Sequence, residues 1–140
     1  MEGYNYKAAA STIKVEEITN DEINRNILQR LKENDPDFDY LAVGSVDRYR
    51  GDNEYFPAGD IDLEWLGCCI GNNTNLRDLR LTSNIFVGIT NGIKQFFRGV
   101  NVNRSIQNIT FAGLHLMGGE IVQSLRPSFE NNGNLSEIVV

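Results

Sequence analysis

The chain has few of the residue types that build disulfides or metal centres. Its 140 residues include one histidine and two cysteines, Cys68 and Cys69, which are adjacent. Adjacent cysteines rarely pair because the ring they would close is strained, and neither has a distant partner. We expect two free thiols, one packed in a helix seam and one at its edge. A metal site needs several ligands at set spacings, and none are so arranged.

Basic residues and long hydrophobic runs are also scarce. The chain has thirteen Lys and Arg residues and nineteen Asp and Glu residues, which gives a net charge of −6. This charge argues against a nucleic-acid-binding surface. No apolar run approaches the ~20 residues that span a bilayer. The first residues carry an acid at Glu2 and no basic start, unlike a secretory signal. We therefore expect a cytoplasmic protein that binds neither nucleic acid nor membrane.

The acidic residues do not form a catalytic pattern. They cluster in an early helical segment and in residues 45–60, where solvated roles are more common. General acid–base work needs a perturbed carboxylate or histidine in a cleft, and the acids of residues 45–60 do not have the spacing of a calcium loop. We expect no enzyme activity, no catalytic residue and no cofactor.

The chain does contain a repeat. The spacing Leu76-x-x-Leu79-x-Leu81 recurs from Ile106 and again from Leu135, at nearly equal intervals along the chain. Phe38-x-x-Leu41-x-Val43 has the same spacing but lies farther from Leu76 than one such interval, and the extra length falls in residues 45–60. A fixed period of this size predicts stacked units, each with a strand, a loop and a helix.

Apolar trios at helical spacing precede these strands, and an asparagine follows each trio at the same distance. The trios are Leu63, Leu66 and Ile70; Ile93, Phe96 and Val100; and Val122, Leu125 and Phe129, and the asparagines are Asn73, Asn103 and Asn132. Before the repeats, Asn20 is a favourable N-cap, an apolar stripe of helical period runs from Ile23 to Leu31, and Asp35-Pro36 favours a helix end.

These patterns predict the organisation of the whole chain. Residues 1–18 are expected to be a flexible tail, and residues 19–140 a repeat domain. Within that domain we expect a helix over 19–35, a first strand motif over 36–44, a long loop over 45–60 and regular repeats over 61–140. The final strand motif has no helix after it to cover it, so we expect self-association through this C-terminal repeat.

The best copy, Leu76-x-x-Leu79-x-Leu81-x-x-Asn84, matches the leucine-rich repeat pattern LxxLxLxxN. Its unit length and full helix resemble the ribonuclease-inhibitor-like class, over residues 36–140. The resemblance implies an α/β fold, a right-handed leucine-rich repeat solenoid with a short arc of parallel strands inside, helices outside and a covering N-terminal helix. The matching positions for the family's asparagine in the other copies include Val46 and Leu114, so irregular turns are expected there.

Members of this family bind proteins on the concave sheet, so the resemblance implies a non-enzymatic protein-binding scaffold with an unidentified protein partner. Alternate strand residues face that side. They form three columns: Tyr40, Asp78, Asn108 and Glu137; Ala42, Arg80, Thr110 and Val139; and Gly44, Thr82 and Ala112. The predicted contact residues are Tyr40, Asp78, Arg80, Thr82, Asn108, Thr110 and Glu137.

Two other functions compete with this hypothesis. Some members of the class regulate an enzyme, as GTPase-activating proteins do, and Arg80 would then be the residue to test. A cell-surface binding domain is the third hypothesis. It would use Arg50-Gly51-Asp52 and the glycosylation sequons that begin at Asn72, Asn103, Asn108 and Asn134. A repeat rich in asparagine produces such sequons easily, and no secretory signal is evident.

Overall fold

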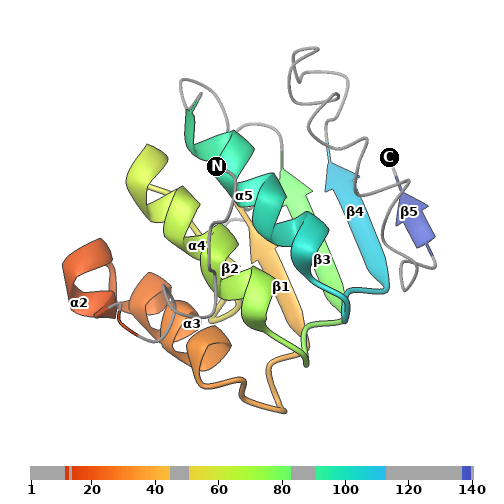
Figure 1. The fold of residues 1–140 in the computed structure, drawn as a ribbon, viewed down its shortest axis with the longest axis horizontal. Coiled ribbons are helices and arrows are strands. Elements are labelled where there is room, and N and C mark those ends of the chain that lie inside the picture. The colour runs from red at the N-terminus through yellow and green to blue at the C-terminus, as the bar shows by residue number, and fades with distance from the viewer. Residues whose placement is uncertain (1–11, 13, 45–50, 83–90, 113–136, 140) are drawn as a thin grey trace.

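A parallel sheet carries helices on one of its faces (Figure 1). The computed structural model describes residue 12 and residues 14–44, 51–82, 91–112 and 137–139. The helices are α2 (Val15–Ile18), α3 (Glu22–Lys32), α4 (Asp60–Asn72) and α5 (Asn91–Val102). The strands are β1 (Tyr40–Val43), β2 (Glu54–Tyr55), β3 (Asp78–Thr82), β4 (Asn108–Ala112) and β5 (Glu137–Val139). The predicted α/β class is confirmed.

The five strands lie in the order β2-β1-β3-β4-β5, and every neighbouring pair is parallel. Strands β1, β3, β4 and β5 are neighbours in the sheet in the same order as in the sequence, and β2 lies on the outer side of β1. Parallel neighbours need a crossover connection, and α4 and α5 supply it between β1 and β3 and between β3 and β4. In Figure 1, α4 and α5 lie in front of the strands, and α3 lies beside α4 at the left of the view.

The core lies between the sheet and these helices. Leu41, Leu79 and Ile109 are matched across β1, β3 and β4, and all three are buried. The first two predicted helix trios are buried too, in α4 and α5. The third trio, from Val122 to Phe129, lies outside the described residues. In the described strands and helices, the hydrophobic period therefore predicts the buried side correctly.

Helix α3 begins and ends with local hydrogen bonds. Its N-cap is Asp21, one position later than the predicted Asn20, because the Asp21 carboxylate accepts the Asn24 N–H at 2.8 Å. At the other end, Asn34 adopts a left-handed conformation with φ 57°. The Asn34 N–H donates to the Leu31 carbonyl and the Asp35 N–H to the Arg30 carbonyl, at 3.1 and 3.0 Å. This Schellman arrangement ends the helix before Pro36 is reached.

Two segments differ from the prediction. Residues 1–18 were expected to be a flexible tail, but residues 15–18 form α2, where Val15 joins the hydrophobic core. Residues 45–60 were expected to be a loop, but Glu54 and Tyr55 form β2. The Gly44 N–H donates to the Tyr55 carbonyl at 2.8 Å, and the Tyr55 side chain is fully buried. In each segment one buried side chain, Val15 or Tyr55, favours an ordered structure. The sequence shows no hydrophobic period there that would predict it.

Helices α4 and α5 approach each other closely at glycines. A Cβ atom on Gly67 would lie 2.6 Å from the Phe96 Cα, and one on Gly99 would lie 1.8 Å from the Gly67 carbonyl oxygen. At the start of the two helices, the Gly92 N–H donates to the Asp60 carboxylate at 2.9 Å. The absence of side chains at these glycines lets the two backbones pack directly against each other.

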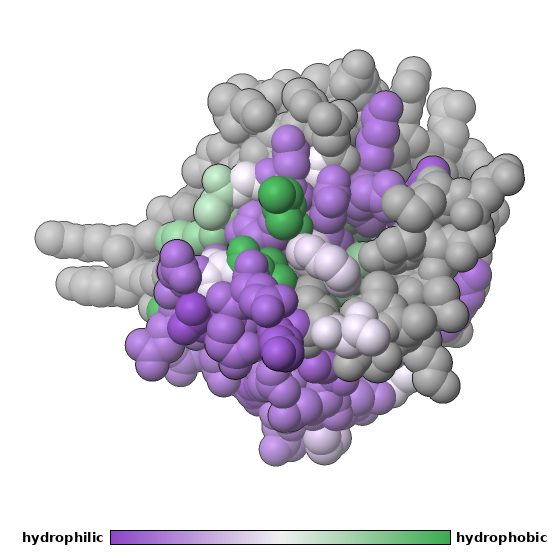
Figure 2. Space-filling view, turned by 60° about the vertical axis from the view of Figure 1, so that its left-hand side comes forward, coloured by the Kyte–Doolittle hydropathy of each residue, from purple (hydrophilic) through white to green (hydrophobic). Residues whose placement is uncertain are grey.

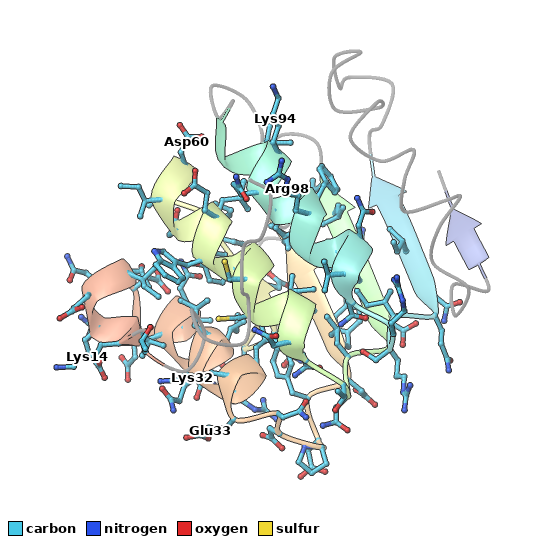
Figure 3. The ribbon with its side chains drawn as sticks, viewed as in Figure 1. Lys14, Lys32, Glu33, Asp60, Lys94 and Arg98 are labelled. Atoms are coloured by element: carbon cyan, nitrogen blue, oxygen red, sulfur yellow. The ribbon has the colours of Figure 1, made fainter. Side chains whose placement is uncertain are left out.

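Polar side chains dominate the surface of the described helices. Figure 2 brings the side of α2 and α3 forward and shows a mostly hydrophilic face with a small hydrophobic group near its centre. Lys94 and Arg98, both exposed, lie one turn apart on α5 (Figure 3). None of the described helices is long and apolar enough to cross a membrane.

Candidate binding face

The strand register places most of the predicted contact residues in two rows. Tyr40, Asp78, Asn108 and Glu137 are matched across β1, β3, β4 and β5, and Ala42, Arg80, Thr110 and Val139 form the next row. Glu54 of β2 joins the second row beside Ala42. In β1, β2, β3 and β4, the described neighbours of these residues along the strand are buried against the helices, so the row residues of these four strands point to the opposite side of the sheet. The polar sheet face comprises Tyr40, Ala42, Glu54, Asp78, Arg80, Asn108 and Thr110.

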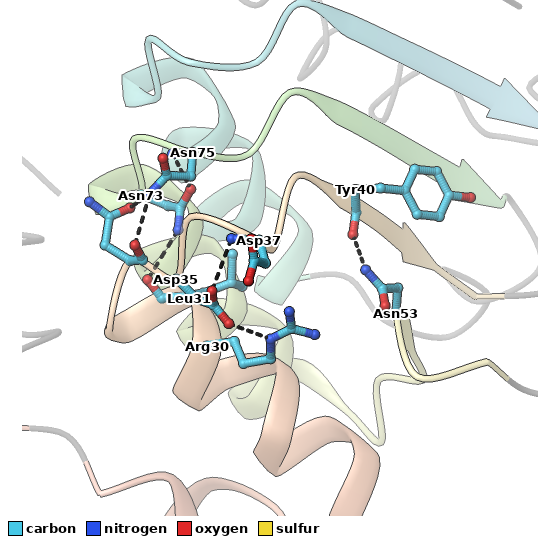
Figure 4. A network of polar contacts seen from close by, with 9 residues as sticks. Arg30, Leu31, Asp35, Asp37, Tyr40, Asn53, Asn73 and Asn75 are labelled. Carbon is cyan, nitrogen blue, oxygen red and sulfur yellow. Dashed lines mark hydrogen bonds and ion pairs between the residues drawn. The ribbon is translucent and has the colours of Figure 1, made fainter.

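Hydrogen bonds orient two residues of the first row. The Asn108 side-chain amide donates to the Asp78 carboxylate at 2.7 Å, so neighbouring strands share a polar pair. The Asn53 side-chain amide donates to the Tyr40 carbonyl at 2.6 Å and ties the segment before β2 to β1 (Figure 4). The Tyr40 side chain itself stays 38% exposed. The row thus combines an exposed aromatic ring with a carboxylate held in one direction.

Thr82 is not available as a contact residue. It was predicted on the concave face, but only 3% of its surface is exposed. Its position is matched to Ala112 of β4, and β3 is the middle strand of the sheet. The alternation along the strand gives the face on which this short side chain lies, but not how far it is buried. Glu137 has the predicted position in β5, and its side chain lies outside the described residues.

Beyond the predicted face, a repeated asparagine closes the loop before each of two strands. Asn73 follows α4, and its side-chain oxygen accepts the N–H groups of Asn75 and Leu76 at 2.8 and 2.7 Å. Its side-chain amide donates to the carbonyl of Leu31 in α3 at 3.2 Å. One buried side chain therefore shapes the loop and also satisfies a carbonyl near the end of the preceding helix.

Asn103 repeats this arrangement in the next unit. Its oxygen accepts the N–H groups of Ser105 and Ile106 at 2.7 and 2.8 Å. Its amide donates to the carbonyls of Ile70 and Asn73 at 2.8 and 2.9 Å. In the sequence these asparagines occur at the same position of each repeat, and this recurrence indicates a structural role. The third, Asn132, lies outside the described residues.

A further asparagine, Asn34 at the end of α3, stabilises the loop that follows Asn73. Its side-chain oxygen accepts the Thr74 N–H at 2.9 Å, and its side-chain amide donates to the Thr74 hydroxyl at 2.6 Å. The Asn75 amide donates in turn to the Asn34 carbonyl at 2.8 Å. Figure 4 shows Asn73 and Asn75 beside the end of α3. The family's own asparagine position, after the strand, has Val46, Asn84 and Leu114, which lie outside the described residues.

This network also explains one of the sequons. Asn103 is buried, and both sides of its amide are engaged, so the folded chain offers no accessible acceptor there. The Ser105 hydroxyl of the same sequon donates within this loop, at 3.1 Å from the Asn103 oxygen. The Asn-x-Ser pattern is thus a structural element of the loop. The tripeptide that begins at Arg50 is only partly described by the structure.

Both cysteines are free and buried in α4, so neither has the edge position expected for one of them. Burial, with a smaller contribution from Cys68, raises the pKa of the Cys69 thiol to about 12 from an ordinary 9.0. Burial and the nearby Asp62 carboxylate also raise the pKa of Tyr55. At neutral pH these groups stay protonated, which disfavours nucleophilic chemistry at Cys69. Among the residues that the structure describes, no group of His, Cys, Asp and Glu could hold a metal ion.

The two raised pKa values predict a loss of stability in alkali. The folded state holds protons that the unfolded state releases, so the free energy of unfolding should be constant below pH 9 and fall above it. The thiol alone contributes a slope of about 1.4 kcal/mol per pH unit up to its folded pKa. Urea unfolding in reductant from pH 8 to pH 10 measures this slope. Cys69→Ala should flatten it below pH 10, and an unchanged slope would contradict the assignment.

The chain matches no known family model and no curated protein. Any functional assignment therefore rests on the geometry of the chain itself.

Proposed function

We propose that the chain is a right-handed leucine-rich repeat solenoid. Three observations support the proposal. Strands β1, β3, β4 and β5 are neighbours in sequence order, and α3, α4 and α5 lie on one side of them. Equivalent loop bonds recur from one unit to the next, as those of Asn73 and Asn103 do. A backbone bond repeats as well: the Asp39 carbonyl accepts the Arg77 N–H, and the Arg77 carbonyl accepts the Gln107 N–H, each at 2.8 Å.

The function that this geometry favours is a non-enzymatic protein-binding scaffold. The observation that carries it is the polar sheet face, where side chains of different chemistry stand in register across neighbouring strands. A regular array of this kind presents donors, acceptors and an aromatic ring to one extended partner. The cytoplasmic location and self-association through the C-terminal repeat stay predictions. In the sheet of the described residues, β5 lies at one edge.

A photo-cross-linking amino acid can test which surface binds. Placed at Thr110, on the polar sheet face, it should form a discrete covalent adduct with a partner protein in an extract of the source cells. The same group at Lys94, exposed on α5, is the matched control and should give none. The adduct at Thr110 should disappear when Asp78→Lys is added. Adducts from Lys94 alone would contradict the proposal and place binding on the helical layer.

One observation favours a regulator of GTP hydrolysis as a second candidate. Arg80 lies on the middle strand and is partly exposed, which is where a partner's nucleotide could meet a guanidinium. A cation supplied in this way stabilises the negative charge that develops during phosphoryl transfer. The scaffold hypothesis needs no such reaction, so it remains the first proposal.

A further inference from the structure

We propose that the occupant of the polar sheet face is an extended protein segment with basic side chains, anchored at Tyr40 and Asp78. This inference rests on the proposed function, because it names the chemistry of the partner that the scaffold binds. Four features of the described residues carry it: the charge of the face, the direction of one carboxylate, the exposed ring beside it, and the opposite charge of α5.

The charges on the face are mainly negative. Asp78 and Glu54 lie on it, Glu137 has the next position of the Asp78 row, and Arg80 is the one base among the residues that define the face. The first row contains no base at all. A segment laid along this row therefore meets acidic and amide groups from one strand to the next, which favours lysine or arginine over acidic side chains.

The Asp78 carboxylate has the orientation and the acceptor capacity to bind a cation. Its carboxylate already receives the Asn108 amide at 2.7 Å, which limits the directions that the group can take. A carboxylate has two oxygens and about four acceptor positions, so one amide donor leaves capacity for a bidentate guanidinium or an ammonium. Because Asp78 is only partly buried, binding a cation there does not require full desolvation of both charges.

Tyr40 supplies an aromatic surface next to this carboxylate. Tyr40 and Asp78 are matched across β1 and β3, and neighbouring strands lie about 4.8 Å apart. The Tyr40 side chain is 38% exposed. A guanidinium or a lysine stem can lie on the ring while its charge reaches the carboxylate.

Helix α5 carries the opposite charge. The exposed side of α5 carries Lys94 and Arg98 one turn apart (Figure 3). A basic segment is repelled by α5 and attracted to the sheet, and the net charge of −6 assists its approach. The sign of the charge thus distinguishes the polar sheet face from α5 for this kind of partner.

A labelled decapeptide that alternates arginine and serine is the probe, with a peptide that alternates glutamate and serine as its counterpart. Fluorescence polarisation measures both against the full chain at low and physiological salt. The arginine peptide should bind and the glutamate peptide should not. Asp78→Asn should weaken binding about threefold, Tyr40→Ala should weaken it by a similar factor, and Arg80→Gln should strengthen it. Each variant should unfold like the wild type.

The matched control is Glu16→Gln, which removes the same charge from an exposed position in α2. It should leave the affinity nearly unchanged. If Glu16→Gln and Asp78→Asn weakened binding of the arginine peptide equally, the effect would come from the overall charge of the protein. That result would overturn this inference. Binding of the glutamate peptide that is lost in Arg80→Gln would also overturn it while leaving the face as the binding surface. The proposed function fails separately, if the Thr110 cross-linker yields no adduct.

Discussion

Gly99→Ala should destabilise the protein by more than about 3 kcal/mol, beyond the usual range for overpacking, because the obstacle is backbone. The added Cβ would lie 1.8 Å from the Gly67 carbonyl oxygen, so α4 and α5 must move apart. Alanine in a helix interior normally stabilises relative to glycine by roughly 0.5–1 kcal/mol, so the sign of the effect is diagnostic. Urea unfolding followed by circular dichroism measures the change.

Gly51→Ala is the control for this substitution. Its Cβ would meet only the Glu54 side chain, at 3.6 Å or more, which is ordinary contact. We expect a change within about 0.5 kcal/mol. If Gly99→Ala were as mild as Gly51→Ala, the close approach of α4 and α5 would be wrong, and with it the way these two units stack.

The second large effect is expected from Asn103→Ala. The substitution removes the acceptor of the Ser105 and Ile106 N–H groups and the donor to the Ile70 and Asn73 carbonyls. A buried polar group left without its partner costs about 1–3 kcal/mol, and several are affected, so we expect a loss of about 3–5 kcal/mol. The same unfolding measurement detects it.

Two variants separate the contributions of this side chain. Asn72→Ala removes an amide whose one bond, to the Cys68 carbonyl, is 3.4 Å long, and it should cost less than about 1 kcal/mol. Asn103→Asp keeps the acceptor for the loop but loses both donors and adds a charge near the helix carbonyls. It should be as destabilising as Asn103→Ala at neutral pH and less so in acid, where the carboxyl is protonated. If Asn72→Ala and Asn103→Ala both lowered the free energy of unfolding by the same small amount, the role assigned to the Asn103 side chain would be wrong.

The sequence predicts the sheet well because both of its signals are periodic. Alternation along a strand determines the face on which a residue lies, and its position within the strand motif determines its neighbour on the next strand. Arg80 and Thr110 could therefore be matched without coordinates, and the structure has them in register. Thr82 shows the limit, since the same alternation does not report how much a short side chain is shielded.

What the sequence did not predict depends on single contacts. Strand β2 exists because Tyr55 is buried and backbone bonds join this strand to β1, and so short a strand cannot show a period. Gly67 and Gly99 do not occupy the same position of the repeat, so nothing in the pattern marks them as neighbours. The asparagines were visible at their fixed place, but their bonds reach the preceding unit, which only a three-dimensional arrangement reveals.

The claim that a recurring asparagine joins each unit to the one before it can be measured at the side chains themselves. Hydrogen exchange of the Asn73 and Asn103 side-chain amides, observed by NMR on the folded protein, tests it most directly. Buried amides that donate to Leu31, Ile70 and Asn73 carbonyls should exchange orders of magnitude more slowly than the Asn72 amide, and only upon opening of the core. Exchange of all three at the same fast rate would show that the loops are not linked in this way.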